Sequence, residues 1–153
     1  MVTLSFDSST LISVLRRDDV RVVEAFTALD VGQTPAMVSV VVLHELWSGA
    51  DLGVNPAGER EKIELVLREF GIAALEAEDV ERSARVRAQL RQQGRPIGDL
   101  DTLIAGQALA RGWTVVTRNV KHFGRVAGLP LVDWSVAPRP LTEAEIAARL
   151  QEA

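Results

Sequence analysis

The sequence predicts an α/β domain with a mostly parallel central sheet of four to five strands. Short β-rich runs alternate along the chain with longer segments whose apolar residues recur at a period near 3.6, which is the pattern of strands separated by amphipathic helices. Glycine and proline fall at several of the expected helix ends, where they favour a boundary. Strands and helices in alternation form parallel sheets that carry helices on both faces.

The expected elements follow in chain order. The strand candidates are residues 2–6, 36–40, 72–75, 114–117 and 129–132. The helix candidates are residues 11–17, 21–29, 43–52, 58–70, 80–93 and 100–111. The run VSVVV at 38–42 suits a longer strand as well as a helix capped by Ser39, so the sequence leaves that helix start open. A last helix is expected after Thr142, because Glu145 completes a capping box with it.

Composition places most of these elements in one domain. With 153 residues, 47% of them hydrophobic and 25% charged, the chain has the length and apolar content of a single globular core. We expect the main domain to span residues 1–134, with 135–153 as an extension that contains a short helix. The chain has no cysteine, which excludes disulfides, thiolate zinc sites and cysteine nucleophiles. No apolar run reaches the ~20 residues of a membrane span and the N-terminus lacks a basic signal region, so we expect a cytoplasmic protein.

The net charge gives no support for non-specific binding to nucleic acid. It is −4, whereas non-specific nucleic-acid binders are usually basic. The distribution of charge is uneven, however, since residues 82–95 hold five arginines and no acid. That run is either an ordinary solvated helix face or, if it borders a site, a surface for a polyanion.

One acidic residue directly follows the first expected strand. Open parallel sheets bind ligands beyond the carboxyl ends of their strands, and Asp7 lies at such an end. Asp7 also suits the N-cap of the next helix. Because Ser8, Ser9 and Thr10 can each cap that helix as well, we favour a functional role for Asp7.

Two more acids lie within expected helices. Glu45 lies either at the edge of a buried helix face or in a site, and the sequence does not separate these alternatives. Asp99 suits N-capping. Asp101 falls instead on the helix face of small apolar residues that approaches the sheet. An isolated carboxylate buried there costs several kcal/mol or more, so Asp101 needs a partner.

If Asp7, Glu45 and Asp101 converge, their mutual repulsion must be relieved. Two carboxylates 4 Å apart repel by about 4 kcal/mol at an effective dielectric constant of ~20. Either some of them stay protonated, or a cation holds them together. Oxygen ligands suit Mg²⁺ or Mn²⁺ rather than zinc. A carboxylate-bound Mg²⁺ activates water and binds phosphate oxygens, so a phosphate ester or phosphodiester is the natural substrate.

Four segments carry a more specific pattern: FDSSTLI, VSVVVLHELWSGA, RPIGDLDTLIAGQALARGWTVVTRN and VKHFGRVAGLPLVDW. In this order and spacing they resemble PIN domains, specifically the VapC-type toxins of bacterial toxin–antitoxin pairs. The resemblance covers residues 2–134. It implies a three-layer α/β/α domain that acts as a metal-dependent endoribonuclease on an RNA substrate.

The resemblance also implies roles for individual residues. The three family acids fall on Asp7, Glu45 and Asp101. Asp7 and Asp101 are then the expected direct Mg²⁺ ligands, while Glu45 holds the metal or its water and is a candidate general base. The hydroxyl residues of the family site match Ser9 and Thr117.

The sequence departs from the family at the fourth acid. The segment after the fourth strand reads TRNVKHF, with Asn119 and His122 where members usually carry an acid. Asn119 still offers a carbonyl oxygen, and His122 is either a surface or packed histidine or a ligand that would favour Mn²⁺. The departure leaves open one or two metals, and a weakened or inactive PIN-like binding module as the alternative function. Arg118 is a candidate RNA contact or an ordinary solvated side chain.

Partners follow from the resemblance as well. VapC-like toxins form homodimers and are neutralised by a cognate VapB-type antitoxin, whose C-terminal segment masks the acidic site. We expect the apolar surface for that segment to come from residues 11–15 and 43–52, with Leu11 and Leu46 as the residues to test. No membrane partner is expected.

Overall fold

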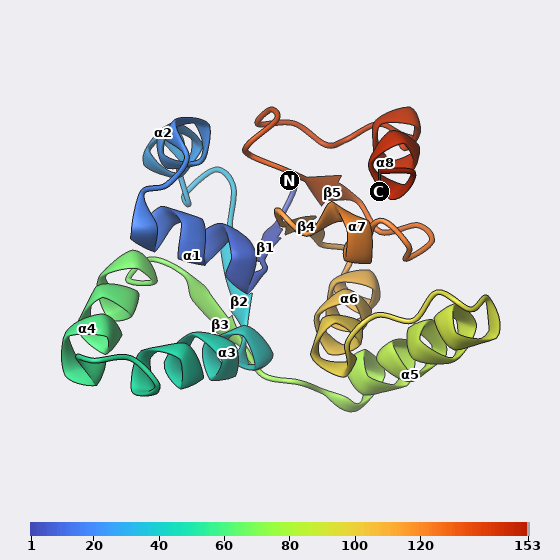
Figure 1. Cartoon of the computed structure of the whole chain (residues 1–153), viewed down its shortest axis with the longest axis horizontal. Helices are drawn as coiled ribbons and strands as arrows, with labels where there is room; N and C mark the ends of the chain where they lie inside the picture. Colours follow the sequence, from blue (N-terminus) through green and yellow to red (C-terminus); the bar gives the residue numbers. More distant parts are fainter. Residues whose placement is uncertain (153) are drawn as a thin grey trace.

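The structure, a computed structural model, describes residues 1–152 and contains one sheet of five parallel strands in the order β3-β2-β1-β4-β5. The strands are β1 (Leu4–Phe6), β2 (Ala36–Ser39), β3 (Gly71–Ala73), β4 (Thr114–Val116) and β5 (Leu131–Val132). The helices are α1 (Ser8–Arg16), α2 (Val20–Ala28), α3 (Val40–Asp51), α4 (Pro56–Val66), α5 (Ala77–Gln92), α6 (Asp99–Arg111), α7 (Val120–Phe123) and α8 (Glu143–Leu150). Figure 1 shows α1, α2 and α4 on one side of the strands, and α5, α6 and α7 on the other. The predicted α/β class and parallel sheet are confirmed.

The strand order creates a crevice at the carboxyl ends of β1 and β4. From β1 the chain steps outward to β2 and β3, and then crosses to the other side of β1 to form β4 and β5. β1 pairs in parallel with both neighbours, so that Ser5 lies opposite Met37 on β2 and Val115 on β4. Connections that leave adjacent strands in opposite directions open a ligand crevice beyond their carboxyl ends. Asp7 and Thr117 follow these two strands and therefore lie at the crevice.

Side-chain caps explain several helix starts. The Ser39 hydroxyl accepts a hydrogen bond from the Val41 backbone N at 3.2 Å, so the VSVVV run divides between β2 and α3. Asp7 occupies the N-cap of α1 although neighbouring hydroxyl residues were available. Asp99 was predicted as an N-cap, and this is wrong: it is the first residue of α6, and its carboxylate pairs with Arg87 at 2.8 Å.

One helix end and one short helix differ from the prediction for local reasons. α4 ends at Val66 instead of residue 70, because the backbone N of Phe70 donates to the carbonyl of Leu67 in a turn that leads directly into β3. α7 was not predicted, because a helix of a single turn is too short to show a 3.6-residue period.

The two helices that precede β4 pack unusually closely. A Cβ atom added at Gly106 of α6 would lie 2.4 Å from the backbone N of Ser83 in α5, so only glycine allows this approach. The buried Asp79 carboxylate on α5 also pairs with Arg111 on α6 at 2.7 Å. α5 is therefore held to α6 by both a backbone contact and a buried ion pair.

The C-terminal extension packs against the domain. The backbone N of Leu141 donates to the carbonyl of Leu131 at 2.8 Å, which adds a short antiparallel contact to β5. The fully buried Asp133 pairs with Arg149 of α8 at 3.1 Å. α8 begins with the predicted capping box of Thr142 and Glu145. Within residues 1–152 no helix is long and apolar enough to cross a membrane.

Candidate active site

Asp7 is fixed at the carboxyl end of β1 by hydroxyl groups from two segments. Its side chain is nearly buried, at 3% exposure. Its Oδ2 accepts hydrogen bonds from Ser9 Oγ at 2.7 Å and from Thr117 Oγ1 at 2.9 Å, while Oδ1 accepts from the backbone N of Ser8 at 2.8 Å. The structure thus brings both predicted hydroxyl residues to this carboxylate, and each donor stabilises the charged form.

Glu45 projects from α3 toward the same region with one oxygen unsatisfied. Its Oε1 is buried and has no hydrogen-bond partner. Burial, together with the charges of Asp7 and Asp101, raises the pKa of Glu45 from 4.5 to about 7, and a hydrogen bond with the Ser8 side chain opposes this shift. The sequence left Glu45 undecided between a buried helix edge and a site. Its electrostatic coupling to both other acids supports the site.

Asp101 lies on the buried side of α6, as the helical wheel predicted. Its side chain is 18% exposed, and its neighbours on that face, Ile104, Ala105 and Ala108, are fully buried. The partner that its burial requires is His122, whose Nδ1 lies 3.1 Å from Asp101 Oδ2. Burial raises the pKa of Asp101, the hydrogen bond from His122 opposes this shift, and the charge of Asp7 adds to it.

The two residues at the fourth-acid position, Asn119 and His122, contact each other. Asn119 Nδ2 lies 3.0 Å from His122 Nδ1, the same ring nitrogen that faces Asp101. One ring nitrogen cannot accept from Asn119 and donate to Asp101 at the same time. A proton on Nδ1 directed at the carboxylate therefore requires the Asn119 amide to turn its oxygen toward the ring. The imidazole is 42% exposed, so solvent and substrate can reach its other edge.

The acidic residues fit a hydrated divalent cation better than a closed metal cage. Among residues 1–152 no three histidine, aspartate or glutamate side chains lie close enough to hold one ion directly. Yet the Glu45 pKa responds to both Asp7 and Asp101, and Glu45 keeps a buried oxygen without a donor. Mg²⁺ keeps several of its waters and uses only one or two carboxylates, so this spacing and this donor set are compatible with it.

Arg118 points away from the acids. Its guanidinium donates to Ser13 Oγ at 3.0 Å and to Asp18 Oδ1 at 3.2 Å, and it lies 3.8 Å from Asp19 Oδ2. Its backbone N donates to Ser9 Oγ at 3.0 Å. Arg118 thus fastens the segment after β4 to α1, and two carboxylates already balance its charge. This geometry favours a structural role over the predicted RNA contact.

A groove begins beside Glu45 and runs between α1, α3 and α4. It encloses about 510 Å³. Apolar and charged side chains line it, among them Ile12, Leu15, Glu45, Leu46 and Ile63. The predicted apolar surface on α1 and α3 therefore exists, but Leu11 is fully buried and does not line it. Replacing Leu11 would test folding, and Ile12 and Leu15 are the better probes.

Sequence reasoning missed two contributors to the site. Ser8 was considered only as a cap, but its hydroxyl influences Glu45. The loop before α6 was part of the family pattern but was given no role, although a Cβ atom at Gly98 would lie 3.8 Å from Asp101 Oδ2. The sequence could have indicated the role of Ser8, because two serines directly follow Asp7. No local sequence pattern indicates the position of Gly98 beside Asp101, because that position depends on how the loop folds.

The fold and the acidic crevice define a class that comparison with known proteins identifies. A PIN domain matches residues 5–129, and the chain therefore belongs to the PIN-domain family. The tRNA(fMet)-specific endonuclease VapC of Shigella flexneri is 33% identical over 135 residues, which cover 88% of this chain and 100% of that protein. This relative places the chain with the VapC proteins of the family, as the sequence predicted.

Solved structures agree with this placement. The DNA-bound VapBC complex of Salmonella typhimurium contains a chain that is 27% identical and aligns with a TM-score of 0.79 over 88% of this chain and 99% of its own length. The VapBC2 complex of Rickettsia felis, bound to a promoter DNA fragment, aligns with a TM-score of 0.80 at 25% identity, over 87% of this chain and 99% of that one. The matched PIN domain ends at residue 129, so α8 lies outside it.

Proposed function

We propose that this protein is a metal-dependent endoribonuclease and the toxin of a toxin–antitoxin pair. The observation that carries the proposal is the position of the acids at the crevice beyond β1 and β4. Contacts through Thr117, Asn119 and His122 connect Asp7 to Asp101 there, and Glu45 keeps a buried oxygen without a partner. Membership of the VapC group supports RNA as the substrate, since the Shigella flexneri relative is named for cleavage of tRNA(fMet). Initiator tRNA is therefore the first substrate to test.

In this proposal Asp7 and Asp101 hold Mg²⁺, or Mn²⁺ in its place, and Glu45 holds a water of the ion. When bound, such an ion lowers the pKa of a coordinated water and stabilises charge on phosphate oxygens. The Ser9 and Thr117 hydroxyls orient the Asp7 carboxylate through the hydrogen bonds to its Oδ2. His122 orients Asp101 in the same way through Oδ2.

Glu45 is the best candidate for the general base. A general base must lose its proton near the working pH. Burial and the charges of Asp7 and Asp101 raise the pKa of Glu45 to about 7 in the metal-free protein, and a cation held by those two acids would lower it and leave Glu45 ready to accept a proton. Its buried oxygen has no internal hydrogen bond to break before it accepts a proton from water. We assign Glu45 the transfer of that proton during attack on the phosphodiester.

We further propose that a VapB-type antitoxin binds in the groove between α1, α3 and α4. The two solved relatives are complexes of this kind. Glu45 lines the groove, so a segment bound in it would lie against one of the catalytic acids. A homodimer and a cytoplasmic location belong to the same proposal, in keeping with the VapC group.

The proposal is tested by RNA cleavage with purified, antitoxin-free protein in Mg²⁺, Mn²⁺ or chelator. We expect cleavage only with metal, and a loss of at least about 100-fold in Asp101→Asn because transition-state charge is no longer stabilised. Asp99→Asn is the matched control, since it makes the same chemical change two residues earlier at an exposed ion pair. Thermal unfolding confirms that both variants fold. Cleavage that persists in chelator or in Asp101→Asn would contradict the proposed chemistry.

The alternative of an inactive PIN-like binding module is decided by the same assay. It draws support from His122, which stands where the family carries an acid. The His122 ring contacts Asp101 Oδ2, an oxygen that would otherwise be available to a metal ion. Folded protein that cleaves no RNA with any metal would favour this alternative. A preference for Mn²⁺ over Mg²⁺ would instead favour an active site in which His122 is a ligand.

A further inference from the structure

Two segments without any acid lie on one side of the crevice. Residues 82–98, which form most of α5 and the loop before α6, contain five arginines and no carboxylate. Residues 117–132, which include α7, contain Arg118, Lys121 and Arg125 and again no carboxylate. All 21 acidic residues therefore lie in the other parts of the chain.

These segments meet beside Asp101. Arg125 Nη1 donates to the carbonyl of Pro96 at 2.8 Å, which joins the turn after α7 to the loop before α6. Two residues further on, Gly98 lies against the Asp101 carboxylate, with 3.8 Å between a Cβ built there and Oδ2. Arg125 thus lies three residues after His122, which contacts Asp101, and it joins this turn to the loop that connects Arg95 with α6.

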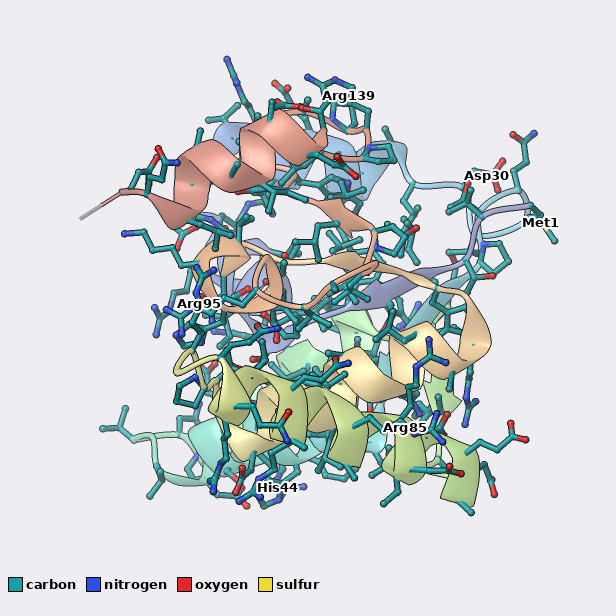
Figure 2. All side chains as sticks on the ribbon, turned by 90° about the vertical axis from the view of Figure 1, so that its right-hand side faces the viewer. Met1, Asp30, His44, Arg85, Arg95 and Arg139 are labelled. Atoms are coloured by element: carbon teal, nitrogen blue, oxygen red, sulfur yellow. The ribbon has the colours of Figure 1, made fainter. Side chains whose placement is uncertain are left out.

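The arginines of this side differ in whether their charge is already balanced. Arg85 pairs with Glu81 at 2.6 Å, and Arg87 pairs with Asp99 at 2.8 Å. Arg91, Arg95 and Arg125 form no ion pair with any carboxylate of residues 1–152. Figure 2 shows Arg95 at the end of α5 that approaches α7, while Arg85 lies well along the helix in the other direction. Of the arginines of residues 82–98 without an ion pair, Arg91 and Arg95 thus lie at the end of α5 nearer the site, and Arg82 lies toward the other end.

The other side of the crevice has the opposite balance. Residues 51–69, which contain α4, hold five acids and three basic residues. An RNA strand that approaches the catalytic carboxylates is repelled by about 2 kcal/mol for each pair of charges 8 Å apart at an effective dielectric constant of ~20. On the groove side Arg60 and Lys62 pair with Asp51 and Glu59, and Arg16 is one basic residue that lines the groove. On the other side Arg91, Arg95 and Arg125 have no ion pair and offer charges that offset this repulsion.

We propose that Arg91, Arg95 and Arg125, together called the basic flank, bind the phosphate backbone of the RNA and lead it to Asp101. The inference rests on the proposed ribonuclease function and names the surface that holds its substrate. Arginine suits this role because its planar guanidinium forms paired hydrogen bonds to phosphate oxygens. Contacts to phosphates carry no sequence information, so the basic flank contributes affinity and direction, and sequence choice arises elsewhere.

The test is RNA binding by full-length, antitoxin-free protein that carries Asp101→Asn, so that the RNA stays intact. The probe is a fluorescent single-stranded RNA, titrated at several salt concentrations. We expect Arg91→Ala and Arg95→Ala to weaken binding about 3- to 10-fold and to lower the slope of log K against log salt by about 0.7 each. Arg91→Lys should retain most of the affinity, and RNAs of different sequence should be affected equally.

Arg82→Ala and Arg85→Ala are matched controls, because they remove the same charge from the more distant part of the same helix. If they weaken RNA binding as much as Arg91→Ala and Arg95→Ala, or if no variant changes the salt slope, the inference is overturned. Loss of antitoxin affinity with unchanged RNA affinity would also overturn it, and would assign the flank to the protein partner. RNA cleavage by the otherwise unchanged chain is measured in parallel. If the protein cleaves RNA but the flank variants bind RNA normally, only this inference is overturned. If the flank variants bind RNA more weakly but the unchanged chain cleaves no RNA, only the proposed nuclease function is overturned.

Discussion

The two sides of the crevice reach the same carboxylates with different chemistry. On the side of α5 and α7, the guanidinium groups of the basic flank form no ion pair with a carboxylate of residues 1–152, in contrast to Arg85 and Arg87. On the side of α1, α3 and α4, a groove of about 510 Å³ presents Ile12, Leu15 and Ile63, with Glu45 at its wall. Charged groups favour a polyanion, whereas apolar side chains in a groove favour an amphipathic peptide segment.

This difference explains how one site can serve a substrate and an inhibitor. In the proposed binding modes, RNA on the basic flank would approach from Asp101, and a peptide in the groove would approach from Glu45. The two ligands then compete only over the acids that lie between these surfaces. Substitutions on one side should therefore change one affinity and leave the other intact.

The largest expected effect is on antitoxin binding through the groove. Ile12 is half-buried and lines the groove without belonging to the fully buried core. Ile12→Glu should weaken VapB-type antitoxin binding about 100-fold, because a desolvated apolar anchor is replaced by a charge. RNA cleavage by the free toxin should stay unchanged. Calorimetric titration and the cleavage assay measure the two effects.

Arg91→Ala serves as the reciprocal control for this experiment. It should leave antitoxin affinity unchanged while it weakens RNA binding. An Ile12→Glu protein that still binds antitoxin with full affinity, and unfolds at the same temperature as the unchanged chain, would show that the antitoxin does not use this groove.

A second prediction compares how closely the helices of the two sides pack against their neighbours. It uses one glycine within a helix on each side. Gly106→Ala should destabilise the fold by about 1–3 kcal/mol, because the new Cβ atom would lie 2.4 Å from the Ser83 backbone N and must force α5 away from α6. Gly49→Ala, on α3 beside the groove, meets nothing within 4 Å. It should stabilise the fold by up to about 1 kcal/mol through helix propensity. Urea unfolding of both variants measures the difference, and equal changes would rule out the close α5–α6 contact.

The helices and strands could be predicted from the sequence. The contacts between residues far apart in the chain could not. Apolar periodicity and caps such as Ser39 and Thr142 act over a few residues, so the strands and most helices were predicted within a few positions. Asp101 stood out because a carboxylate on a buried helix face conflicts with its surroundings. Its partner His122 could not be found from the sequence, because their contact requires the loop, α6 and α7 to be in place.

The same limit applies to charge. The arginine run at 82–95 was visible, but its division into balanced and unbalanced members was not. Arg87 is balanced by Asp99, which lies on a different helix. Arg118 was a candidate RNA contact from its neighbours in sequence, yet Asp18 and Asp19 at the end of α1 bind it. Pairings between distant segments therefore decide which basic residues are available to a ligand.

The third prediction concerns Glu45, which lines the groove and is one of the proposed catalytic acids. Its pKa is raised in the folded protein from 4.5 to about 7, so the folded state binds more protons than the unfolded state between these two values. The stabilisation is then fully present below pH 4.5 and is lost as the pH rises through 7.

Glu45→Gln keeps a neutral side chain at every pH. In chelator, this variant should therefore unfold at nearly the temperature of the unchanged chain at pH 4.5, and at a higher temperature at pH 8. Glu61→Gln, the same change at an exposed position of α4, should show no such dependence on pH. Equal unfolding temperatures at pH 8 would mean that Glu45 loses its proton without cost, and that the groove side is not coupled to Asp7 and Asp101 through this residue.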